Sequence, residues 1–585
     1  MLYSTIVDVY EKISSTSKRL EMTDYLVEMF RQTPPELVDK VVYLSQGKIY
    51  PDFMGLELGV GEKLALKAIS FACGIDEGDV QKKWIELGDI GLVAEWAISS
   101  KKQSALFHTP LTVERVFENF DKVIKASGSK SIQLKIKLLA ELLHDSTPLE
   151  AKYIIRTIIG KLRLGVADMT ILDALALAYA SKEEREKIEH AYNISSDLGR
   201  VARTLALSGI EGLKDVHVTL GIPLRAMLAE RLSSIEEIFE KLNGKCAFEY
   251  KYDGLRIQAH IDGNGVTLFS RHLENISPQF PDVIAGIKDA FRGKEAVLEG
   301  ECVPVDPSTG RMLPFQQVSH RRGRKYEISA AMNEVPVVLF LFDCMYADGE
   351  ELVHKDFLTR RKKLQSLIEE NEKVRFSTML ITSSLEEAEN FFERAIADGC
   401  EGLMAKSISK DSTYRAGARG WQWIKYKMEY KTEMMDTVDL VVVGAFAGHG
   451  KRAGLYGALL MAAYNDEDDT FETVCKLGTG FDDALLAQLP DKFQQHLLEH
   501  VHPRVKSNIE ADFWFNPVVV LEVIGAEISL SPVHTCGYGL KSKNAGFALR
   551  FPRFTGRWRE DKGPEEATTT KEILRIYERQ MKKLQ

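Results

Sequence analysis

The sequence predicts a multidomain fold: an all-α N-terminal domain, an α+β middle domain and a small β-barrel of the OB-fold type. Three observations support this prediction. The 585 residues exceed what one hydrophobic core organises, and apolar residues follow a helical period over about the first 215 residues. Beyond Gly221 the pattern changes to short alternating strands. We expect domains at 1–218, 219–432 and 433–567, followed by a helical tail at 568–585.

The first domain combines helical periodicity with a helix start signal. Thr33, Pro34 and Glu36 fit an N-cap threonine, a first-turn proline and a glutamate three residues after the cap. Apolar residues recur at helical spacing at 64–71, 132–140 and 171–178. These patterns predict an all-α domain.

The middle domain mixes the two periodicities. Strand patterns occur at 246–252, 256–260, 266–270, 296–305 and 335–345, and helical patterns at 281–292, 355–370 and 384–397. This order predicts an α+β domain built on antiparallel sheets.

The third domain shows short β segments separated by glycine turns. The segments are 440–444, 456–463, 473–477 and 518–524. About five strands in a domain of this size suit a Greek-key barrel of the OB type, a class that often binds nucleic acid. The tail from Thr570 to Gln585 has the pattern of a basic amphipathic helix.

Composition restricts the class of protein. Apolar residues make up 45% and charged residues 28%, as in globular proteins, and the net charge is -9. Nucleic-acid contact must therefore come from local basic patches. Seven widely spaced cysteines without a C-x-x-C pair argue against a zinc site or disulfide framework. With no signal peptide and no membrane-length apolar run, we expect a cytoplasmic protein without membrane contact.

The stretch from Ala247 to His260 organises the middle domain. It reads as two strand segments broken by a tight turn at Asp253 and Gly254, with Lys251 where the first strand ends. A lysine on rigid backbone that faces a cleft is well placed to act as a nucleophile. The alternative is a surface lysine followed by an ordinary hairpin.

Charged and aromatic residues recur on the later strands. Glu299 and Glu301 share one strand face, because side chains at i and i+2 point the same way. Together the strands supply a nucleophile, cations, carboxylates for a divalent metal and an aromatic platform, which transfer to phosphorus requires. The residues that carry these groups are Lys251, Arg271, Glu299, Glu301, Phe342, Asp343, Glu401, Lys406, Lys425 and Lys427.

The segment Lys251-Tyr-Asp-Gly-Leu-Arg256 resembles motif I of the covalent nucleotidyltransferases, the superfamily of polynucleotide ligases and mRNA capping enzymes. Later motifs match in order: Ser270–Glu274, Glu299–Glu301, Phe342–Asp343, Glu401–Lys406, Trp423–Lys427 and Leu549–Phe554 leading into Arg559–Lys562. With the helical N-terminal region, Gly160–Gly165 and Gln316–Lys325, the whole chain resembles the ATP-dependent DNA ligases of the archaeal and eukaryotic replicative type.

This resemblance implies a three-step reaction. Lys251 attacks the α-phosphorus of ATP and forms lysyl-AMP, AMP passes to the 5′-phosphate at a nick in duplex DNA, and the 3′-hydroxyl displaces AMP. Such an enzyme acts in DNA replication, repair and recombination, and we expect it to be a cytoplasmic, DNA-associated monomer. An ordinary lysine has a pKa of about 10.4, so the site must favour the free amine.

The resemblance also implies roles for single residues. Glu249 recognises adenine, Phe342 stacks on the ring, Arg256 and Arg271 contact ribose and phosphate, and Arg419 and Lys425 bind the nucleotide phosphates. Glu301 contacts the ribose or the metal, and Glu401 is a metal ligand for Mg²⁺, with Mn²⁺ as an alternative. Arg550 and Arg553 of the barrel orient pyrophosphate in the first step only, which makes the linker from Lys427 to Asp439 an expected hinge.

Two features concern partners. Lys161 and Arg163 lie between glycines at a helix junction and are expected to bind the DNA backbone, the alternative being a solvated loop. Gln103–Phe107 resembles the peptide by which replicative ligases dock on a ring-shaped sliding clamp, with Leu106 where a second aromatic is common.

Two other readings are compatible with the motifs. An RNA ligase or a capping guanylyltransferase shares the superfamily core, although a capping enzyme uses GTP and needs no helical domain at 1–215. A catalytically dead DNA-binding scaffold is disfavoured, because the lysine and both candidate metal carboxylates are present.

Overall fold

The computed structural model describes residues 1–101, 109–128, 130–306, 312–313, 315–322, 332, 334–427, 437–448 and 454–583. The chain forms two compact units, mainly residues 1–427 and 428–585. The peptide Gln103–Phe107 and residues 428–436 of the expected hinge lie outside the described residues. In the described part of the chain, no helix is long and apolar enough to cross a bilayer.

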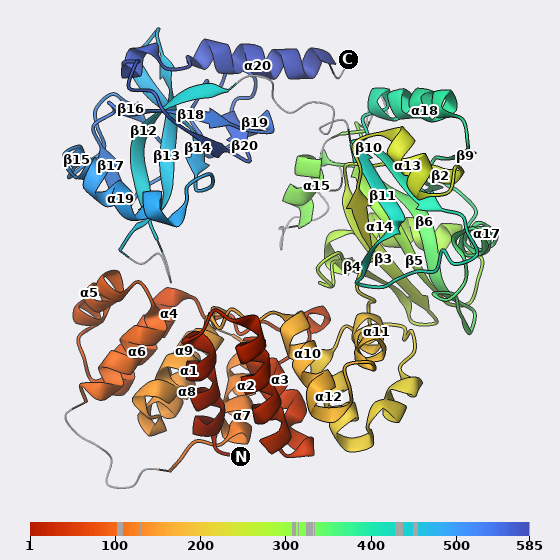
Figure 1. Cartoon of the computed structure of the whole chain (residues 1–585), viewed down its shortest axis with the longest axis horizontal. Coiled ribbons are helices and arrows are strands. Elements are labelled where there is room, and N and C mark those ends of the chain that lie inside the picture. The colour runs from red at the N-terminus through yellow and green to blue at the C-terminus, as the bar shows by residue number, and fades with distance from the viewer. Residues whose placement is uncertain are drawn as a thin grey trace. The chain divides into compact units, whose positions relative to one another are not determined.

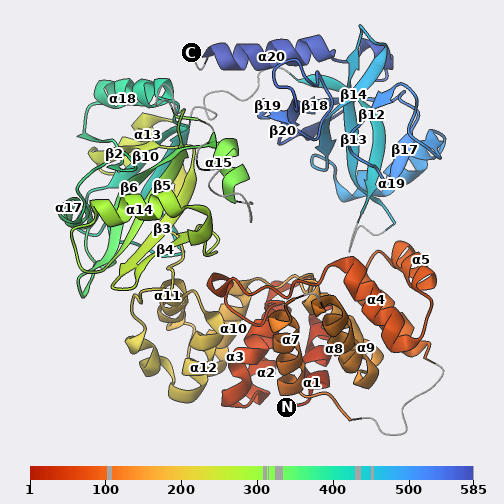
Figure 2. The same ribbon diagram turned by 180° about the vertical axis from the view of Figure 1, so that it is seen from behind.

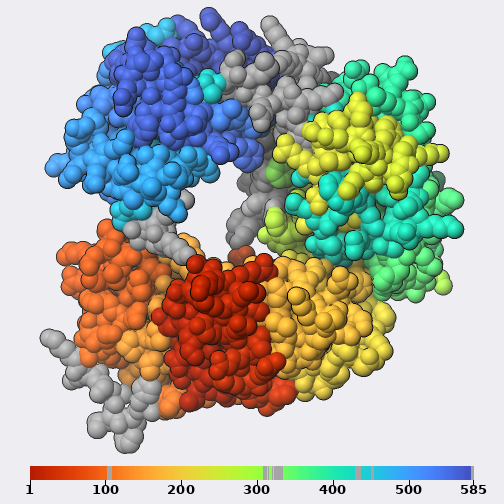
Figure 3. Space-filling view, viewed as in Figure 1, coloured from red at the N-terminus to blue at the C-terminus, as the bar shows by residue number. Residues whose placement is uncertain are grey.

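The N-terminal part of the first unit is all-α, as predicted (Figure 1). Its helices bury apolar faces, as α1 does with Ile6, Tyr10 and Ile13. In the space-filling view, the packed helices form one continuous red-to-yellow surface (Figure 3). The α-helices of this part are α1 (Tyr3–Ser14), α2 (Arg19–Gln32), α3 (Val38–Ser45), α4 (Glu62–Cys73), α5 (Glu77–Leu87), α6 (Ile90–Ser99), α7 (Val113–Lys125), α8 (Ser131–Asp145), α9 (Pro148–Ile158), α10 (Asp168–Tyr179), α11 (Arg185–Ser195) and α12 (Leu198–Ser208).

The predicted helix start at Thr33 is wrong. Thr33 instead ends α2, where its hydroxyl donates to the Met29 carbonyl at 2.8 Å, and a 3₁₀ turn at Pro35–Leu37 leads into α3. A capping box does form at Thr147 and Glu150, at the start of α9. A threonine hydroxyl can accept from a free N–H or donate to a free carbonyl, so it fits either end of a helix.

The middle of the chain is an α+β domain with two sheets. The first sheet has the order β1 (Leu228–Arg231), β11 (Arg419–Lys427), β10 (Gly402–Ser407), β2 (Cys246–Lys251) and β9 (Met379–Thr382). The second has the order β4 (Gly265–Ser270), β3 (Leu255–Asp262), β5 (Ala296–Pro304), β6 (Val337–Ala347) and β7 (Glu350–Glu351), and β8 (Val374–Phe376) also pairs with β6. The helices are α13 (Ile235–Lys241), α14 (Pro281–Ala290), α15 (Phe315–Arg322), α17 (Phe357–Leu367) and α18 (Leu385–Ala397).

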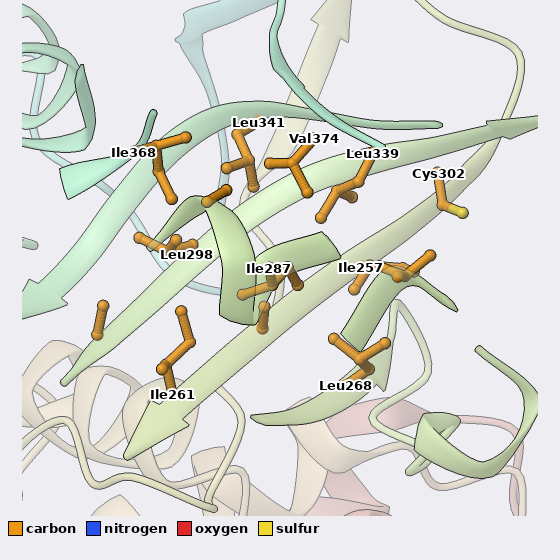
Figure 4. Close-up of a cluster of buried hydrophobic side chains, with 14 of the residues drawn as sticks. Ile257, Ile261, Leu268, Ile287, Leu298, Cys302, Leu339, Leu341, Ile368 and Val374 are labelled. Carbon is orange, nitrogen blue, oxygen red and sulfur yellow. The ribbon is translucent and has the colours of Figure 1, made fainter. Parts of the chain in front are cut away.

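The core of the second sheet lies between its strands and α14, which crosses the sheet in the view from behind (Figure 2). Ile287 of α14 packs among Ile257, Leu298 and Leu341 of the strands (Figure 4). This apolar layer fixes the strands whose ends carry the predicted site residues.

The turn at Asp253 and Gly254 does not close a hairpin. β2 and β3 belong to different sheets, with β2 paired to β9 and β10 and β3 paired to β4 and β5. The turn therefore carries the chain from one sheet to the other, and the hairpin reading was wrong. Alternating strands on both sides of a two-residue turn give the same sequence pattern in either case.

The second unit is β-rich and OB-like, as predicted. Among its described residues an eight-stranded sheet follows the order β15 (Leu497–Leu498), β17 (Phe513–Phe515), β12 (Val438–Ala447), β13 (Tyr456–Asn465), β14 (Thr470–Leu477) and β16 (Val505–Lys506), with β18 (Val520–Ile524) between β12 and β21 (Arg553–Trp558). A further pair is β19 (Glu527–Ser531) and β20 (Gly546–Arg550), and the helices are α19 (Asp483–Gln494) and α20 (Thr570–Lys583). The estimate of five strands was low because several strands are only two or three residues long.

The predicted tail helix is present as α20. Ile573 is fully buried in the apolar core of the barrel, and Gln580 accepts from the Ile528 N–H at 3.0 Å. The helix is therefore part of the barrel unit.

Replacing Gly254 with alanine should destabilise the middle domain. The new Cβ would lie 2.5 Å from the Cys302 carbonyl oxygen and 3.0 Å from Glu301 Cγ, both on β5. Because paired backbone yields little, we expect a loss of about 1–3 kcal/mol in the free energy of unfolding, measured by chemical denaturation. Gly263→Ala, at the other end of β3, is the control, because its Cβ meets nothing within 4 Å. Equal stability of the two variants would contradict this reading.

Candidate active site

The sheet register places Lys251 beside a carboxylate. Gly402, the first residue of β10, faces Lys251 on β2 and Lys427 on β11. The preceding residue, Glu401, donates its N–H to the Lys251 carbonyl at 2.9 Å. Its carboxylate accepts from Lys251 Nζ and lies 3.0 Å from Lys427 Nζ. Two lysines from different strands thus share one carboxylate.

A cleft of about 470 Å³ surrounds this lysine and is lined by both sheets. It brings together the residues for which nucleotide or metal contact was predicted in the middle domain. These residues are Glu249, Lys251, Arg256, Arg271, Glu301, Phe342, Glu401, Arg419 and Lys425.

One end of the cleft combines a buried carboxylate with aromatic rings. Glu249 lies 2.5 Å from Lys406 Nζ and accepts from Ser377 Oγ at 3.0 Å. Lys406 Nζ also lies 4.7 Å and 4.5 Å from the ring centroids of Phe342 and Trp423, which meet edge to face. Burial lowers the pKa of Lys406, although the charge of Glu249 opposes it. A flat heterocycle with N–H groups suits this end.

Arg256 binds mainly to other groups of the protein. Its guanidinium makes two hydrogen bonds to Glu299, at 3.1 and 2.8 Å, and one to the Met227 carbonyl at 2.9 Å. It therefore braces β3 against β5 and against the start of β1, while its side chain still lines the cleft.

Three carboxylates interact electrostatically around Lys251. Burial raises the pKa of Glu301 to about 7, with Lys251 and Arg256 opposing the rise and Glu401 adding to it. Burial also raises the pKa of Asp253, and Glu401 adds to this rise. Burial acts on Glu401 in the same direction, but the ammonium groups of Lys251 and Lys427 outweigh it and lower its pKa.

These three carboxylates fit a site for a divalent cation whose remaining ligands come from the substrate. A cation would offset both burial and the repulsion between carboxylates, which together oppose ionisation of Glu301 and Asp253. Within the described ranges, no group of three His, Cys, Asp or Glu side chains could hold a metal ion. Magnesium fits such a site, because it takes one or two carboxylates together with phosphate oxygens and water.

A cluster of cations forms another wall. Burial lowers the pKa of Lys425, and the charges of Lys427, Lys251, Arg419 and Arg271 lower it further. Mutual repulsion among these groups is relieved by an anion, so the wall suits a polyphosphate.

Residues whose roles sequence reasoning missed brace this cleft. Arg361 on α17 donates to the Leu341 carbonyl and to Ser377 Oγ and lies 3.4 Å from Glu249. The pairing of Glu299 with Arg256 was likewise not assigned. Charged residues on an otherwise apolar helix or strand were the available signal, because a buried charge requires a partner.

Lys161 and Arg163 are displayed on a loop between α9 and α10. Leu162 and Leu164 are buried, whereas the two cationic side chains are exposed. Arg163 has a φ of 57°, and Lys161 pairs with Glu62 at 2.7 Å. The loop is therefore anchored by its leucines and presents its cations to solvent.

Arg550 and Arg553 lie at the end of β20 and the start of β21. Both are exposed, and Phe551 between them is 75% exposed with a φ of 50°. This turn presents two cations and an aromatic ring on the surface of the second unit.

Three family models match the chain. The model described as DNA ligase N terminus matches residues 2–176, ATP dependent DNA ligase domain matches 226–427, and ATP dependent DNA ligase C terminal region matches 452–562.

Relatives match over the full length. DNA ligase 2 of Thermofilum pendens is 53% identical across 99% of this chain and 98% of its own length. DNA ligase 2 of Korarchaeum cryptofilum is 50% identical across 100% of this chain and 98% of its own length. A solved structure named Pmar-Lig_Pre has a TM-score of 0.55 at 16% identity, covering 95% of this chain and 99% of that chain, and supports the fold alone.

Removing the charge of Asp343 should destabilise the domain that holds the cleft. Asp343 and Arg360 are both fully buried and joined by two hydrogen bonds, at 2.7 and 2.9 Å. Asp343→Asn leaves the arginine charge uncompensated, so we expect a loss of about 3–5 kcal/mol in the free energy of unfolding.

The control is Glu369→Gln, which breaks an exposed pair with Arg292 in the same domain and should cost less than about 1 kcal/mol. Denaturant titration compares the two variants, and a small loss for Asp343→Asn would show that the pair does not hold β6 in place.

Proposed function

This chain belongs to the ATP-dependent DNA ligase family, and we propose that it forms its covalent intermediate on Lys251. The protein is a DNA ligase that seals nicks in duplex DNA with ATP as the AMP donor, through lysyl-AMP. The observation that supports Lys251 is its place in a cleft lined by both carboxylates and cations.

In the first step the Lys251 amine attacks the α-phosphorus of ATP. A phosphorus–nitrogen bond forms, the bond from the α-phosphorus to the leaving pyrophosphate breaks, and the amine releases a proton to solvent. Glu401 accepts a hydrogen bond from the amine and orients it. The cation wall of Arg271, Arg419 and Lys425 neutralises the phosphates.

The base occupies the aromatic end of the cleft in this proposal. Phe342 packs against the adenine, and Glu249, fixed by Lys406 and Ser377, accepts from its amino group. Glu299 and Met227 occupy part of the Arg256 guanidinium, so Arg256 contacts the ribose with the remaining N–H groups. Arg550 and Arg553 of the barrel unit orient pyrophosphate.

Glu301 and Glu401 would hold the divalent metal, for which Mg²⁺ fits and Mn²⁺ is the alternative. Bound there, the metal supplies charge that stabilises the phosphates. Glu301 binds a metal in its deprotonated form. Because burial raises the pKa of Glu301 to about 7, a bound cation would shift it toward that form near neutral pH.

The remaining steps use the same cleft. A 5′-phosphate oxygen at the nick attacks the phosphorus of lysyl-AMP, and Lys251 leaves as the amine. The 3′-hydroxyl then attacks the activated 5′-phosphate, the strand is joined, and AMP departs.

The rival readings predict other partners. A capping enzyme needs no helical region, whereas residues 2–176 match a DNA ligase N-terminal model. A catalytically dead scaffold would not need the carboxylate that contacts Lys251.

Incubation with α-labelled ATP and Mg²⁺ tests Lys251. We expect acid-labile, base-stable label on the protein, discharged by nicked DNA and not by nicked RNA. Lys251→Arg keeps the charge beside Glu401 but removes the nucleophile, so label should fall at least a thousandfold. Lys245→Arg, at an exposed position before β2, is the control. Label that survives in Lys251→Arg, or that requires GTP, would reject the proposal.

The loop cations should contribute to DNA affinity. In Lys161→Ala/Arg163→Ala we expect weaker binding of nicked duplex and a salt slope smaller by about 1–2, because fewer phosphates are neutralised. Affinity is measured by fluorescence anisotropy between about 50 and 200 mM salt. Lys182→Ala/Lys187→Ala removes the same charge elsewhere in the helical region. An unchanged slope in the loop variant would exclude phosphate contact.

Docking on a ring-shaped sliding clamp through Gln103–Phe107 is a further proposal, carried by the peptide pattern alone. Phe107→Ala should abolish pull-down with the clamp, because the aromatic anchor contributes most of the affinity of such a peptide. Ser104→Ala serves as the matched change, and equal recovery of both variants would remove the proposal.

A further inference from the structure

Three segments meet at one point beside the cleft. They are Asn193 in α11, Arg225 in the segment that leads to β1, and Gly417 just before β11. The Arg225 N–H donates to the Asn193 carbonyl, and the Gly417 N–H donates to the Arg225 carbonyl, both at 2.9 Å. A Cβ on Gly417 would lie 2.2 Å from Asn193 Oδ1, so only glycine allows this approach. The helical region is thus joined to the middle domain through backbone contacts.

The side chain of Arg225 is directed to the helical region. Its guanidinium lies 4.6 Å from the ring centroid of Tyr192, donates to the Tyr192 hydroxyl, and lies 3.4 Å from Asp168 Oδ2. Asp168 also accepts from Tyr192 at 2.5 Å and from Gln46 at 2.8 Å. These contacts anchor Arg225 to α10 and α11, and they do not belong to the nucleotide cleft.

The segment after Arg225 forms part of the cleft wall. The Met227 carbonyl accepts from Arg256 at 2.9 Å, and the Leu228 N–H donates to the Ala418 carbonyl at 3.0 Å. Leu228 pairs with Arg419 at the start of β11, and both residues line the cleft. A shift of Arg225 would therefore move a wall residue and a cation that the proposed function assigns to phosphate.

Buried apolar side chains also connect the helical region with the cleft. Ile194 of α11 belongs to one buried cluster with Leu224, Met227 and Trp423, and Phe342 packs against this cluster. A hydrophobic path thus runs from the helical region to the aromatic end of the cleft.

We propose that Arg225 is a positioning residue for ATP binding. It holds the cleft wall at 227–229, and with it Arg419, in place against helices α10 and α11. The cleft then has its full affinity for ATP only while the helical region is in place. This inference rests on the proposed role of Lys251, because formation of lysyl-AMP is its readout.

The test is the rate of lysyl-AMP formation as a function of ATP concentration in single turnovers of the full chain. In Arg225→Ala we expect the half-saturating ATP concentration to rise about tenfold, while the rate at saturation and the final labelled fraction stay near those of the wild type. Arg225→Lys keeps a charge opposite Asp168 but loses the planar stacking on Tyr192, so it should give a smaller rise. Arg203→Ala breaks a half-exposed pair with Asp39 within the helical region and should leave the curve unchanged.

A merely structural role predicts a different result. Misfolding reduces the labelled fraction without changing the half-saturating concentration of the molecules that remain active. An unchanged half-saturating concentration in the Arg225 variants would therefore overturn the proposal, and if Arg225→Ala does not fold, Arg225→Lys decides. Failure of the wild type to form any label would instead reject Lys251 as the nucleophile, and this inference with it.

Discussion

The pairing of β10 with β2 on one side and β11 on the other determines the chemistry of the cleft. Because Gly402 faces both Lys251 and Lys427, the residue before it lies between two ammonium groups. A Cβ on Gly402 would lie 2.1 Å from the Tyr426 carbonyl oxygen, so the strands approach this closely only with glycine there. A shift of β10 by one residue would turn its side chains to the opposite face and remove Glu401 from the lysines.

Charged side chains gather around the lysines that this strand register brings together, and their positive and negative charges balance only in part. Glu401 compensates Lys251 and Lys427, whereas burial and the neighbouring cations lower the pKa of Lys425. Burial raises the pKa of Glu301, and the carboxylates of Glu401 and Asp253 add to this rise against the opposing charges of Lys251 and Arg256. The free protein thus holds cation-rich and carboxylate-rich walls in one cleft, and the metal nucleotide proposed to bind there would carry the complementary charge for each wall.

Much of this arrangement could be predicted from the sequence. Alternation located β2, β3, β5 and β6 to within about two residues, because each has one consistent apolar pattern. Side chains that share a strand, such as Glu299 and Glu301, could be placed on one face. The nine cleft residues were recognised by resemblance to a family, because spacing alone leaves a surface lysine equally acceptable.

Contacts between distant segments could not be predicted in this way. That β2 and β3 belong to different sheets depends on which strands pair, and a local pattern does not contain that information. The role of Thr33 depends on which end of a helix it caps. The partners of Arg225, Tyr192 and Asp168, lie more than 30 residues away in the sequence. Short strands such as β15 and β16 contain too few residues for a period to be visible.

Buried ion pairs hold the strands of the cleft in register, although the chemistry of the cleft needs exposed charge. Asp343 with Arg360, and Glu299 with Arg256, lie on or beside the strands that carry Phe342 and Glu301. Such pairs contribute little net stability relative to apolar residues, but a displaced strand would leave a buried charge uncompensated. The cost of an altered register is therefore larger than the net stability that these pairs give the native one, and the strands that carry Phe342 and Glu301 are held in their places in the cleft.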